Sequence, residues 1–396
     1  NKDYTQNDTV GKAGMEQHYE TYLRGKNGEQ KFYIDNVGRI SEIISSTDSV
    51  AGDDLYLSID ADLQKATYLA LQNEIAAIVY SNIKSGEIPI NDVYTALIGN
   101  SVINIEHFSK AKASDTEKNV LSVFKSRQKT TLGKIKQELT SSPEALNTMS
   151  DEVLDEFTYI ISMLKDDQVL LKNEIDTSDS VYQKWKNQKI SPKEYLSYCI
   201  TQHWIDISQL NVDEKYADST EVYDALCKYI LKNIKTDTEF SKIIYQYMIT
   251  RGEISPRQLC LILFDQGVLD YDDATVNKLK NGSLSPRDFL MKKIYNIEIT
   301  PAQLALEPCT GSCVVTDEKT GEILAMVSYP GYDSNKLANG VDSEYFASLQ
   351  HDKSSPLLNY ATQQKTAPGS TFKLVSATAG LAENVITTSD QIRCTG

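Results

Sequence analysis

Cysteine, histidine and long apolar runs are scarce in this sequence, and each scarcity excludes a class of protein. Six cysteines among 396 residues are too few for a disulfide-built scaffold. Cys309 and Cys313 have no second pair of cysteines of the kind that a zinc site needs, so we expect mostly buried thiols. In an oxidising compartment, one disulfide remains an alternative. The four histidines are scattered, and none lies in a recognisable nucleophile motif, which disfavours a histidine-based triad. The cysteines are Cys199, Cys227, Cys260, Cys309, Cys313 and Cys394.

No run of 18 apolar residues occurs, so no segment is predicted to span a bilayer. The first residues resemble neither a signal peptide nor a natural start, and we expect the chain to begin downstream of a removed segment. A net charge of −15, from 55 acidic and 40 basic residues, disfavours nonspecific attraction to nucleic acid or anionic lipid, because both are negative. The composition, 40% hydrophobic and 24% charged, fits a globular protein of two or three domains.

The N-terminal part of the chain contains three successive residue patterns. Residues 1–49 are polar and punctuated by glycines, which predicts turns and short strands. The apolar run 55–59 is bounded by acidic residues and predicts a strand. From residue 63 to 78 apolar residues recur at broadly helical spacing, which predicts a helix ending near Tyr80.

Residues 84–299 are rich in Lys, Glu, Ile and Leu and poor in Gly, which predicts a mostly helical domain. One pattern recurs there: an apolar residue, a hydroxyl, a proline, then a carboxylate or amide three residues after the hydroxyl. Each copy predicts a helix start, with the hydroxyl as N-cap and proline in the first turn. Because the spacings are unequal, the pattern favours helix starts in a bundle over a solenoid repeat. The copies begin at Ile190, Ile254, Leu284 and Ile299.

The C-terminal part returns to strand patterns. Residues 312–316 and 322–328 are two β-type runs, and residues 317–321 between them have the length and the late glycine of a hairpin connection. Pro330 and Gly331 are expected to end the second strand.

The segment with the clearest chemical potential is Thr-Ala-Pro-Gly-Ser-Thr-Phe-Lys at residues 366–373. Pro368 and Gly369 permit a sharp turn, after which Ser370 is expected at the start of a helix. Residues three apart share a helix face, so the amine of Lys373 would lie within reach of the Ser370 hydroxyl. A desolvated, neutral lysine can take the proton of a serine nucleophile, and the helix N-terminus offers N–H groups to an oxyanion.

The bare Ser-x-x-Lys spacing carries no weight, because it recurs five times where we expect solvated helix faces: Ser81/Lys84, Ser109/Lys112, Ser122/Lys125, Ser126/Lys129 and Ser162/Lys165. The context of Ser370 is distinctive. Residues 367–373 resemble the nucleophile box of class B penicillin-binding proteins. Residues 14–39 resemble the family's N-terminal noncatalytic region, residues 54–64 its entry into the transpeptidase domain, and residues 320–335 the sheet before the nucleophile.

The resemblance implies an α+β fold with a partial transpeptidase domain of the serine β-lactamase type. Its expected parts are an N-terminal noncatalytic segment (1–49), the start of the transpeptidase domain (50–83), a large helical insertion (84–304) and the domain's continuation (305–396). Residues 84–304 match no family element, and the expected Ser-x-Asn and Lys-Thr-Gly boxes do not follow Lys373. Lys319–Gly321 precedes the nucleophile and is expected in a turn, and residues 389–391 are expected in a surface turn or helix cap. We therefore expect a sequence that ends before the site is complete and is inactive as it stands.

The resemblance further implies an extracytoplasmic, membrane-anchored peptidoglycan D,D-transpeptidase of the bacterial cell wall. Ser370 would attack the D-alanyl-D-alanine carbonyl of a stem peptide, with Lys373 as its base, and β-lactams would acylate the same serine. The implied partners are peptidoglycan stem peptides, β-lactam antibiotics and cell-wall synthesis proteins on the insertion; no cofactor, metal or nucleic acid is implied.

Two other functions remain open. One is a noncatalytic cell-wall scaffold or sensor that uses the insertion, and its tyrosines at 223, 229, 245 and 247, to bind proteins. The same tyrosines would alternatively pack inside a helical spacer. The other is a serine β-lactamase, which would need a deacylating base and would lack the N-terminal resemblance.

Overall fold

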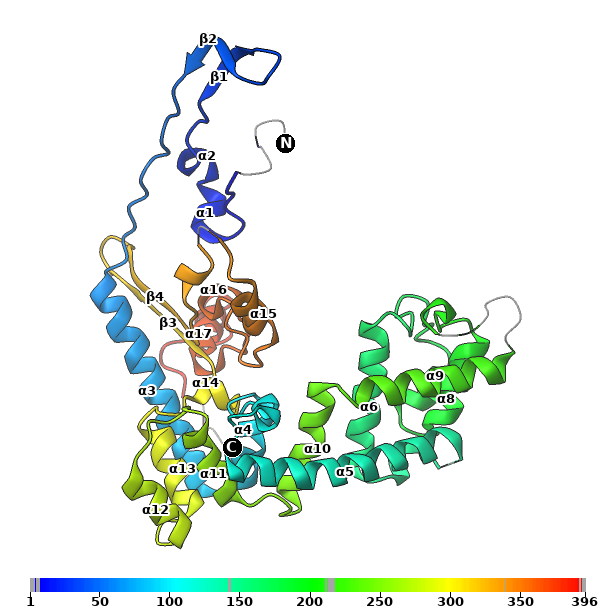
Figure 1. Cartoon of the computed structure of the whole chain (residues 1–396). Helices are drawn as coiled ribbons and strands as arrows, with labels where there is room; N and C mark the ends of the chain where they lie inside the picture. Colours follow the sequence, from blue (N-terminus) through cyan, green and yellow to red (C-terminus); the bar gives the residue numbers. More distant parts are fainter. Residues whose placement is uncertain are drawn as a thin grey trace. The chain divides into compact units, whose positions relative to one another are not determined.

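The computed structural model describes residues 4, 8–141, 144–210, 212, 218–338, 340–391 and 393. The chain forms two compact units. Unit 1 contains Asn1–Tyr68, Ser312–Gln350 and Ser355–Gly396, and unit 2 contains Leu69–Gly311 and His351–Ser354. Helices dominate, and each of the two sheets found in the described residues has two strands (Figure 1). The predicted α+β class is confirmed at this level.

Unit 1 begins with two short helices, which were not predicted, and a β-hairpin, which agrees with the short strands that the glycine-punctuated sequence predicts. The elements are α1 (Gly14–His18), α2 (Glu20–Leu23), β1 (Glu29–Ile34) and β2 (Ile40–Thr47). The two strands pair antiparallel, from Glu29 opposite Thr47 to Ile34 opposite Ile40. Gly38 adopts a φ of 79° in the connecting turn, a backbone conformation that glycine adopts without strain.

The strand predicted at residues 55–59 is wrong. Every residue of this stretch is described, and none belongs to a strand. The Tyr56 side chain is 89% exposed. The segment touches a strand only near its end, where the Asp60 N–H donates to the Leu324 carbonyl at 2.9 Å and Ser58 Oγ donates to the Ile323 carbonyl at 2.7 Å. An apolar run needs a partner over several residues to form a strand, and this one lacks it.

The C-terminal hairpin of the chain is confirmed. It consists of β3 (Gly311–Thr316) and β4 (Ile323–Tyr329), which pair with each other. Alternate residues of β4 are buried, as the strand period of two requires: Ala325, Val327 and Tyr329. The helix α3 (Ala61–Ser85) contributes Gln64, whose amide accepts from Met326 N–H and donates to the Met326 carbonyl, at 2.7 Å each. This side chain therefore pairs with β4 as a neighbouring strand would.

The strand β4 ends at Tyr329, so Pro330 and Gly331 lie outside it, as expected. Short helices follow β4 in unit 1. They are η4 (Ser334–Lys336), α15 (Ser343–His351), α16 (Tyr360–Gln363), η5 (Gly369–Thr371) and α17 (Phe372–Ala382).

Unit 2 is helical, as the composition of residues 84–299 predicts. Its α-helices after α3 are α4 (Ile90–Gly99), α5 (Asp115–Thr140), α6 (Asp151–Asp166), α7 (Ser180–Lys186), α8 (Pro192–Thr201), α9 (Ser219–Ile234), α10 (Thr238–Thr250), α11 (Pro256–Asp265), α12 (Asp273–Asn281), α13 (Pro286–Tyr295) and α14 (Pro301–Leu304). Short 3₁₀ helices lie at η1 (Ile105–Ser109), η2 (Leu146–Thr148) and η3 (Ile207–Gln209).

The four predicted helix starts are confirmed. Ser191, Ser255, Ser285 and Thr300 are the N-caps of α8, α11, α13 and α14, and a proline occupies the first turn of each helix. At α11 and α14 the amide three residues after the cap returns a hydrogen bond, which completes a capping box.

The structure adds a feature that the sequence pattern only hinted at. Each copy of the pattern forms a corner between two helices and begins with a buried or half-buried apolar residue. Two residues before that apolar residue, the backbone adopts a left-handed conformation, which ends the preceding helix. A fifth corner precedes α4, where Pro89 replaces the hydroxyl. The left-handed residues are Gly86, Gln188, Gly252, Gly282 and Ile297, with φ from 59° to 89°. Ile297 is the exceptional member, because a β-branched side chain is strained at positive φ.

Two substitutions at equivalent corners are expected to have opposite effects on stability. Gly252→Ala places a Cβ in open space but at a φ of 75°, so it should cost about 1 kcal/mol. Ile297→Gly relieves the backbone strain at a φ of 59°, which should stabilise unit 2 by about 1 kcal/mol. The loss of the isoleucine side-chain contacts reduces this gain. Urea denaturation of both variants measures this, and a destabilised Ile297→Gly protein would contradict the strain at residue 297.

The tyrosines of unit 2 are used inside the unit. Tyr245 is buried and its ring stacks on Phe124 with centroids 4.2 Å apart. Tyr223 donates to the Leu139 carbonyl at 2.7 Å, Tyr229 to Asp167 at 2.9 Å and Tyr247 to Asp155 at 2.6 Å. These contacts join helices and favour the packed spacer over tyrosine-mediated recognition.

The cysteines follow the prediction as far as they are described. Cys199, Cys227, Cys260 and Cys309 are buried free thiols and Cys313 is a half-buried one, whereas Cys394 lies outside the described residues. Burial raises the pKa of Cys199 and of Cys260 to about 12, so these thiols stay protonated and unreactive at neutral pH.

Candidate active site

The predicted nucleophile lies in a turn just before a helix. Gly369 has a φ of 58° and opens the 3₁₀ turn η5, which contains Ser370. Thr371 Oγ1 donates to the Pro368 carbonyl at 2.5 Å and closes the turn. The helix α17 begins at Phe372, so Ser370 precedes the α-helix instead of beginning it, and Lys373 is the helix's second residue.

Both predicted site residues are exposed. Among the described residues, no hydrogen bond links the Ser370 hydroxyl to the Lys373 amine. No residue of α17 is buried, and Leu374 and Val375 are 76% and 55% exposed. The exposed serine is accessible to a substrate, and the Lys373 side chain is exposed to solvent as well.

A cavity that sequence reasoning missed lies elsewhere in unit 1. Its volume is about 460 Å³, within the range of small-molecule sites. Neither Ser370 nor Lys373 contributes to it. Tyr345 Oη accepts from the Asp333 N–H at 2.8 Å and fixes one wall. The lining residues are Gln64, Tyr68, Val327, Ser328, Gly331, Tyr332, Asp333 and Tyr345.

Two motifs that only look like the family's catalytic boxes, Lys319–Gly321 and residues 389–391, lie in turns, as predicted. Lys319 and Thr320 donate their backbone N–H groups to Asp317 Oδ1 in the β3–β4 turn, at 2.8 and 2.9 Å. Asp390 closes a surface turn by accepting from the Thr387 N–H at 2.7 Å.

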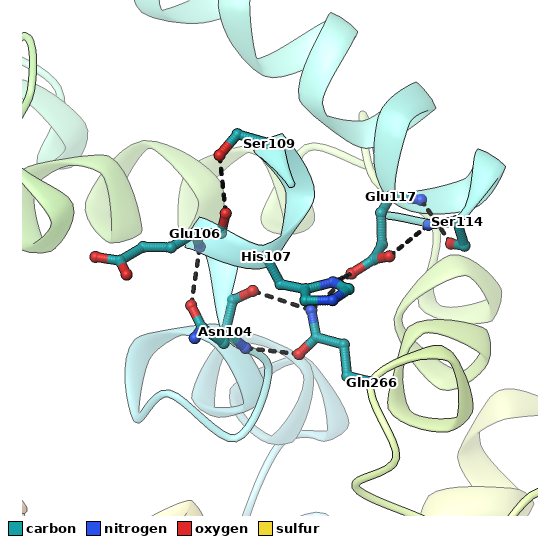
Figure 2. A network of polar contacts seen from close by, with 7 residues as sticks. All are labelled: Asn104, Glu106, His107, Ser109, Ser114, Glu117 and Gln266. Atoms are coloured by element: carbon teal, nitrogen blue, oxygen red, sulfur yellow. Dashed lines mark hydrogen bonds and ion pairs between the residues drawn. The ribbon is translucent and has the colours of Figure 1, made fainter. Parts of the chain in front are cut away.

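Unit 2 contains a buried carboxylate whose partners are all structural (Figure 2). Glu117 accepts from His107 Nδ1 at 2.7 Å, Gln266 Nε2 at 2.8 Å and the Ser114 N–H at 2.7 Å. Burial alone would raise the pKa of Glu117, but the hydrogen bonds from Gln266 and Ser114 outweigh it and leave that pKa below its ordinary value. Gln266 also pairs with the backbone of Asn104 in both directions, at 2.9 Å. The network joins η1, α5 and the end of α11, so its hydrogen bonds hold these three elements together.

A second buried carboxylate joins three helices. Glu152 on α6 is 3% exposed and accepts from two arginines. Arg127 of α5 donates to its two oxygens at 2.9 and 3.0 Å, and Arg251 at the end of α10 donates at 3.0 and 2.5 Å. Arg127 also forms an ion pair with Glu253, with Nη1 and Oε1 3.7 Å apart. Paired, charge-assisted bonds of this kind fix the relative position of α5, α6 and α10.

One turn further along α6, Glu156 is buried beside Glu152. It is 1% exposed, and no described residue donates a hydrogen bond to its Oε1. Burial, followed by the negative charge of Glu152, raises the pKa of Glu156 to about 8, against smaller opposing effects of Lys134 and Arg127. This side chain is therefore protonated at neutral pH.

No cluster of three or more metal-ligating side chains occurs within the described ranges. In the same ranges, no helix combines the length and the apolar composition needed to cross a bilayer.

Comparison with known proteins finds a penicillin-binding-protein domain model that matches each end of the chain. The Penicillin binding protein transpeptidase domain matches residues 311–396, and the Penicillin-binding Protein dimerisation domain matches residues 1–57. The resemblance to class B penicillin-binding proteins is thereby confirmed for the two ends. No solved structure matches the chain.

Curated relatives carry the name peptidoglycan D,D-transpeptidase. PbpA of Mycolicibacterium smegmatis is 46% identical over 77 residues, which is 19% of this chain and 16% of PbpA. MrdA of Escherichia coli is 45% identical over 74 residues, 19% of this chain and 12% of MrdA. MrdA of Haemophilus influenzae is 44% identical over 82 residues, 21% of this chain and 13% of that protein. The chain thus aligns with less than a fifth of each of these relatives.

Proposed function

We propose, from the two family matches at its ends, that this chain is part of a peptidoglycan D,D-transpeptidase that acts through a serine acyl-enzyme. The observation that carries the proposal is the segment around Ser370. It lies within the matched transpeptidase region, and a left-handed glycine and a 3₁₀ turn present its hydroxyl to solvent directly before a helix.

In the proposed chemistry this segment supplies the nucleophile and its base. Ser370 Oγ attacks the carbonyl of the D-alanyl-D-alanine bond while the Lys373 amine accepts the hydroxyl proton. Backbone N–H groups near Ser370 would contribute to stabilising the oxyanion. The terminal D-alanine leaves with a proton, and an amine of a neighbouring strand then takes the acyl group and releases the serine. β-Lactams would form a stable ester with the same oxygen.

The arrangement of domains is part of the proposal. The transpeptidase domain would be interrupted by a helical insertion at residues 84–304, and the compact helical unit at Leu69–Gly311 supports this division. The name of the relatives, peptidoglycan D,D-transpeptidase, supports an extracytoplasmic location at the bacterial membrane.

A fluorescent penicillin tests the proposal on the whole protein. Covalent labelling is expected for the wild type and is expected to vanish in Ser370→Ala. The matched control is Ser376→Ala, which removes an exposed hydroxyl of α17 that donates to the Phe372 carbonyl at 3.2 Å. An unlabelled wild type would leave the scaffold function, and labelling that survives in Ser370→Ala would exclude Ser370 as the acylated residue.

A further inference from the structure

One stretch of unit 2 is rich in basic residues and poor in acidic ones. Residues 110–136 contain eight lysines and arginines but only two acidic residues, Asp115 and Glu117. Glu117 is buried, so Asp115 is the one acidic residue of the stretch at the surface. The net charge of −15 for the whole chain therefore hides a strongly positive segment.

Four of these lysines form a straight row on α5. Lys118, Lys125, Lys129 and Lys136 are separated by seven, four and seven residues. At 3.6 residues per turn these spacings keep them within about 40° of one another around the helix axis, over a length of about 27 Å. We call these four residues the lysine row.

The lysine row faces solvent. All four side chains are exposed, whereas Val120, Phe124 and Ile135 on the other side of α5 are buried. Lys118 lies 3.9 Å from the exposed Asp115, and among the described residues no acidic side chain pairs with the other three lysines. The row is flanked by the small residues Ser122 and Gly133 on one side and by the half-buried Leu121 and Leu132 on the other. The row is thus a flat cationic strip with little competing negative charge.

The surroundings of the row indicate what kind of partner it fits. Among the described residues from 79 to 270, no large hydrophobic side chain is exposed. A protein interface depends on buried aromatic or aliphatic anchors, and a helix that enters a membrane surface needs an apolar face. Neither is available here. Recognition by this surface must be electrostatic, and lysines bind phosphate groups as point charges.

We propose that the lysine row binds a linear phosphate-bearing polyanion, laid along α5. A flexible polymer with a phosphate every few ångströms reaches all four ammonium groups and releases condensed counterions, which drives binding without apolar contact. The acidic remainder of the protein does not prevent this, because charges beyond about 10 Å are screened at 0.1 M salt. The proposal does not depend on acylation at Ser370.

Binding of linear inorganic polyphosphate to the whole chain tests the row. The wild type should bind, and four phosphate contacts should weaken its affinity roughly 50-fold between 50 and 200 mM salt. The variant K118Q/K125Q/K129Q/K136Q should bind at least about 10-fold more weakly at 50 mM salt and with a flatter salt dependence. A control with equal charge loss at exposed lysines off the row, K172Q/K186Q/K280Q/K292Q, should stay within about 2-fold of wild type.

Three results would overturn the proposal. One is an equal loss of affinity in the row variant and the control, which would mean that only net charge matters. The others are tighter binding of poly-L-glutamate, or of vesicles containing phosphatidylglycerol, than of polyphosphate at equal charge. Both variants are expected to fold, because all eight substituted side chains are exposed and none lies in the core. Thermal melting of both variants checks this.

Discussion

Glu152→Ala is expected to destabilise unit 2 by about 3–5 kcal/mol, a large part of the stability of an ordinary domain. Removing this carboxylate leaves Arg127 and Arg251 partly buried without their shared counter-ion. Uncompensated charge is costly because neither guanidinium can lose its proton at accessible pH. Both tryptophans of the chain, Trp185 and Trp204, lie in unit 2, so their fluorescence during urea denaturation reports on this unit alone.

The exposed acidic residue Glu239 provides the control. It pairs with Lys242 on the surface of α10, where an ion pair contributes at most about 1 kcal/mol. Glu239→Ala should therefore shift the urea midpoint little. Equal midpoint shifts for Glu152→Ala and Glu239→Ala would contradict the view that Glu152 holds α5, α6 and α10 together.

The stability of unit 2 is expected to fall as pH rises from about 5 to about 8, and Glu156 is the reason. The unfolded chain releases the Glu156 proton near the ordinary value of 4.5, whereas burial raises the folded-state pKa to about 8. Between these values the folded state binds more protons than the unfolded state, so its stability declines with pH. At about 1.4 kcal/mol per pH unit, the full loss amounts to several kcal/mol.

Glu156→Gln isolates this effect, because an amide resembles the protonated acid and does not titrate. The free-energy difference between the wild type and Glu156→Gln should grow from pH 5 to pH 8 and level off above pH 8. Tryptophan-detected urea denaturation at several pH values measures it. A constant difference across this range would show that Glu156 has the same pKa in both states.

Local patterns were sufficient for much of the fold. The hydroxyl and proline before α8, α11, α13 and α14 predict where these helices begin, because capping involves groups within four residues of one another. The β3–β4 hairpin was predictable for the same reason. The prediction at residues 55–59 failed because an apolar run becomes a strand only beside a partner, and the sequence does not say whether one is present.

The candidate site was predictable as a segment but not as a geometry. The Pro-Gly bend marks the turn before α17, and the spacing of Ser370 and Lys373 follows from the sequence. Whether a lysine is desolvated depends on residues brought against it from elsewhere, and the exposed Lys373 shows that spacing alone does not supply this.

The sequence by itself determined where four helices of unit 2 start, where the C-terminal hairpin turns and where an accessible serine lies. It also contained the spacing of the lysine row. Only the tertiary structure decided which charged and aromatic side chains are buried. Glu152 stands in an acidic stretch of α6 typical of a solvated surface, yet it is buried by arginines 25 and 99 residues away. Helix caps and turns are governed by near neighbours, whereas burial is governed by packing between segments that are distant in the sequence.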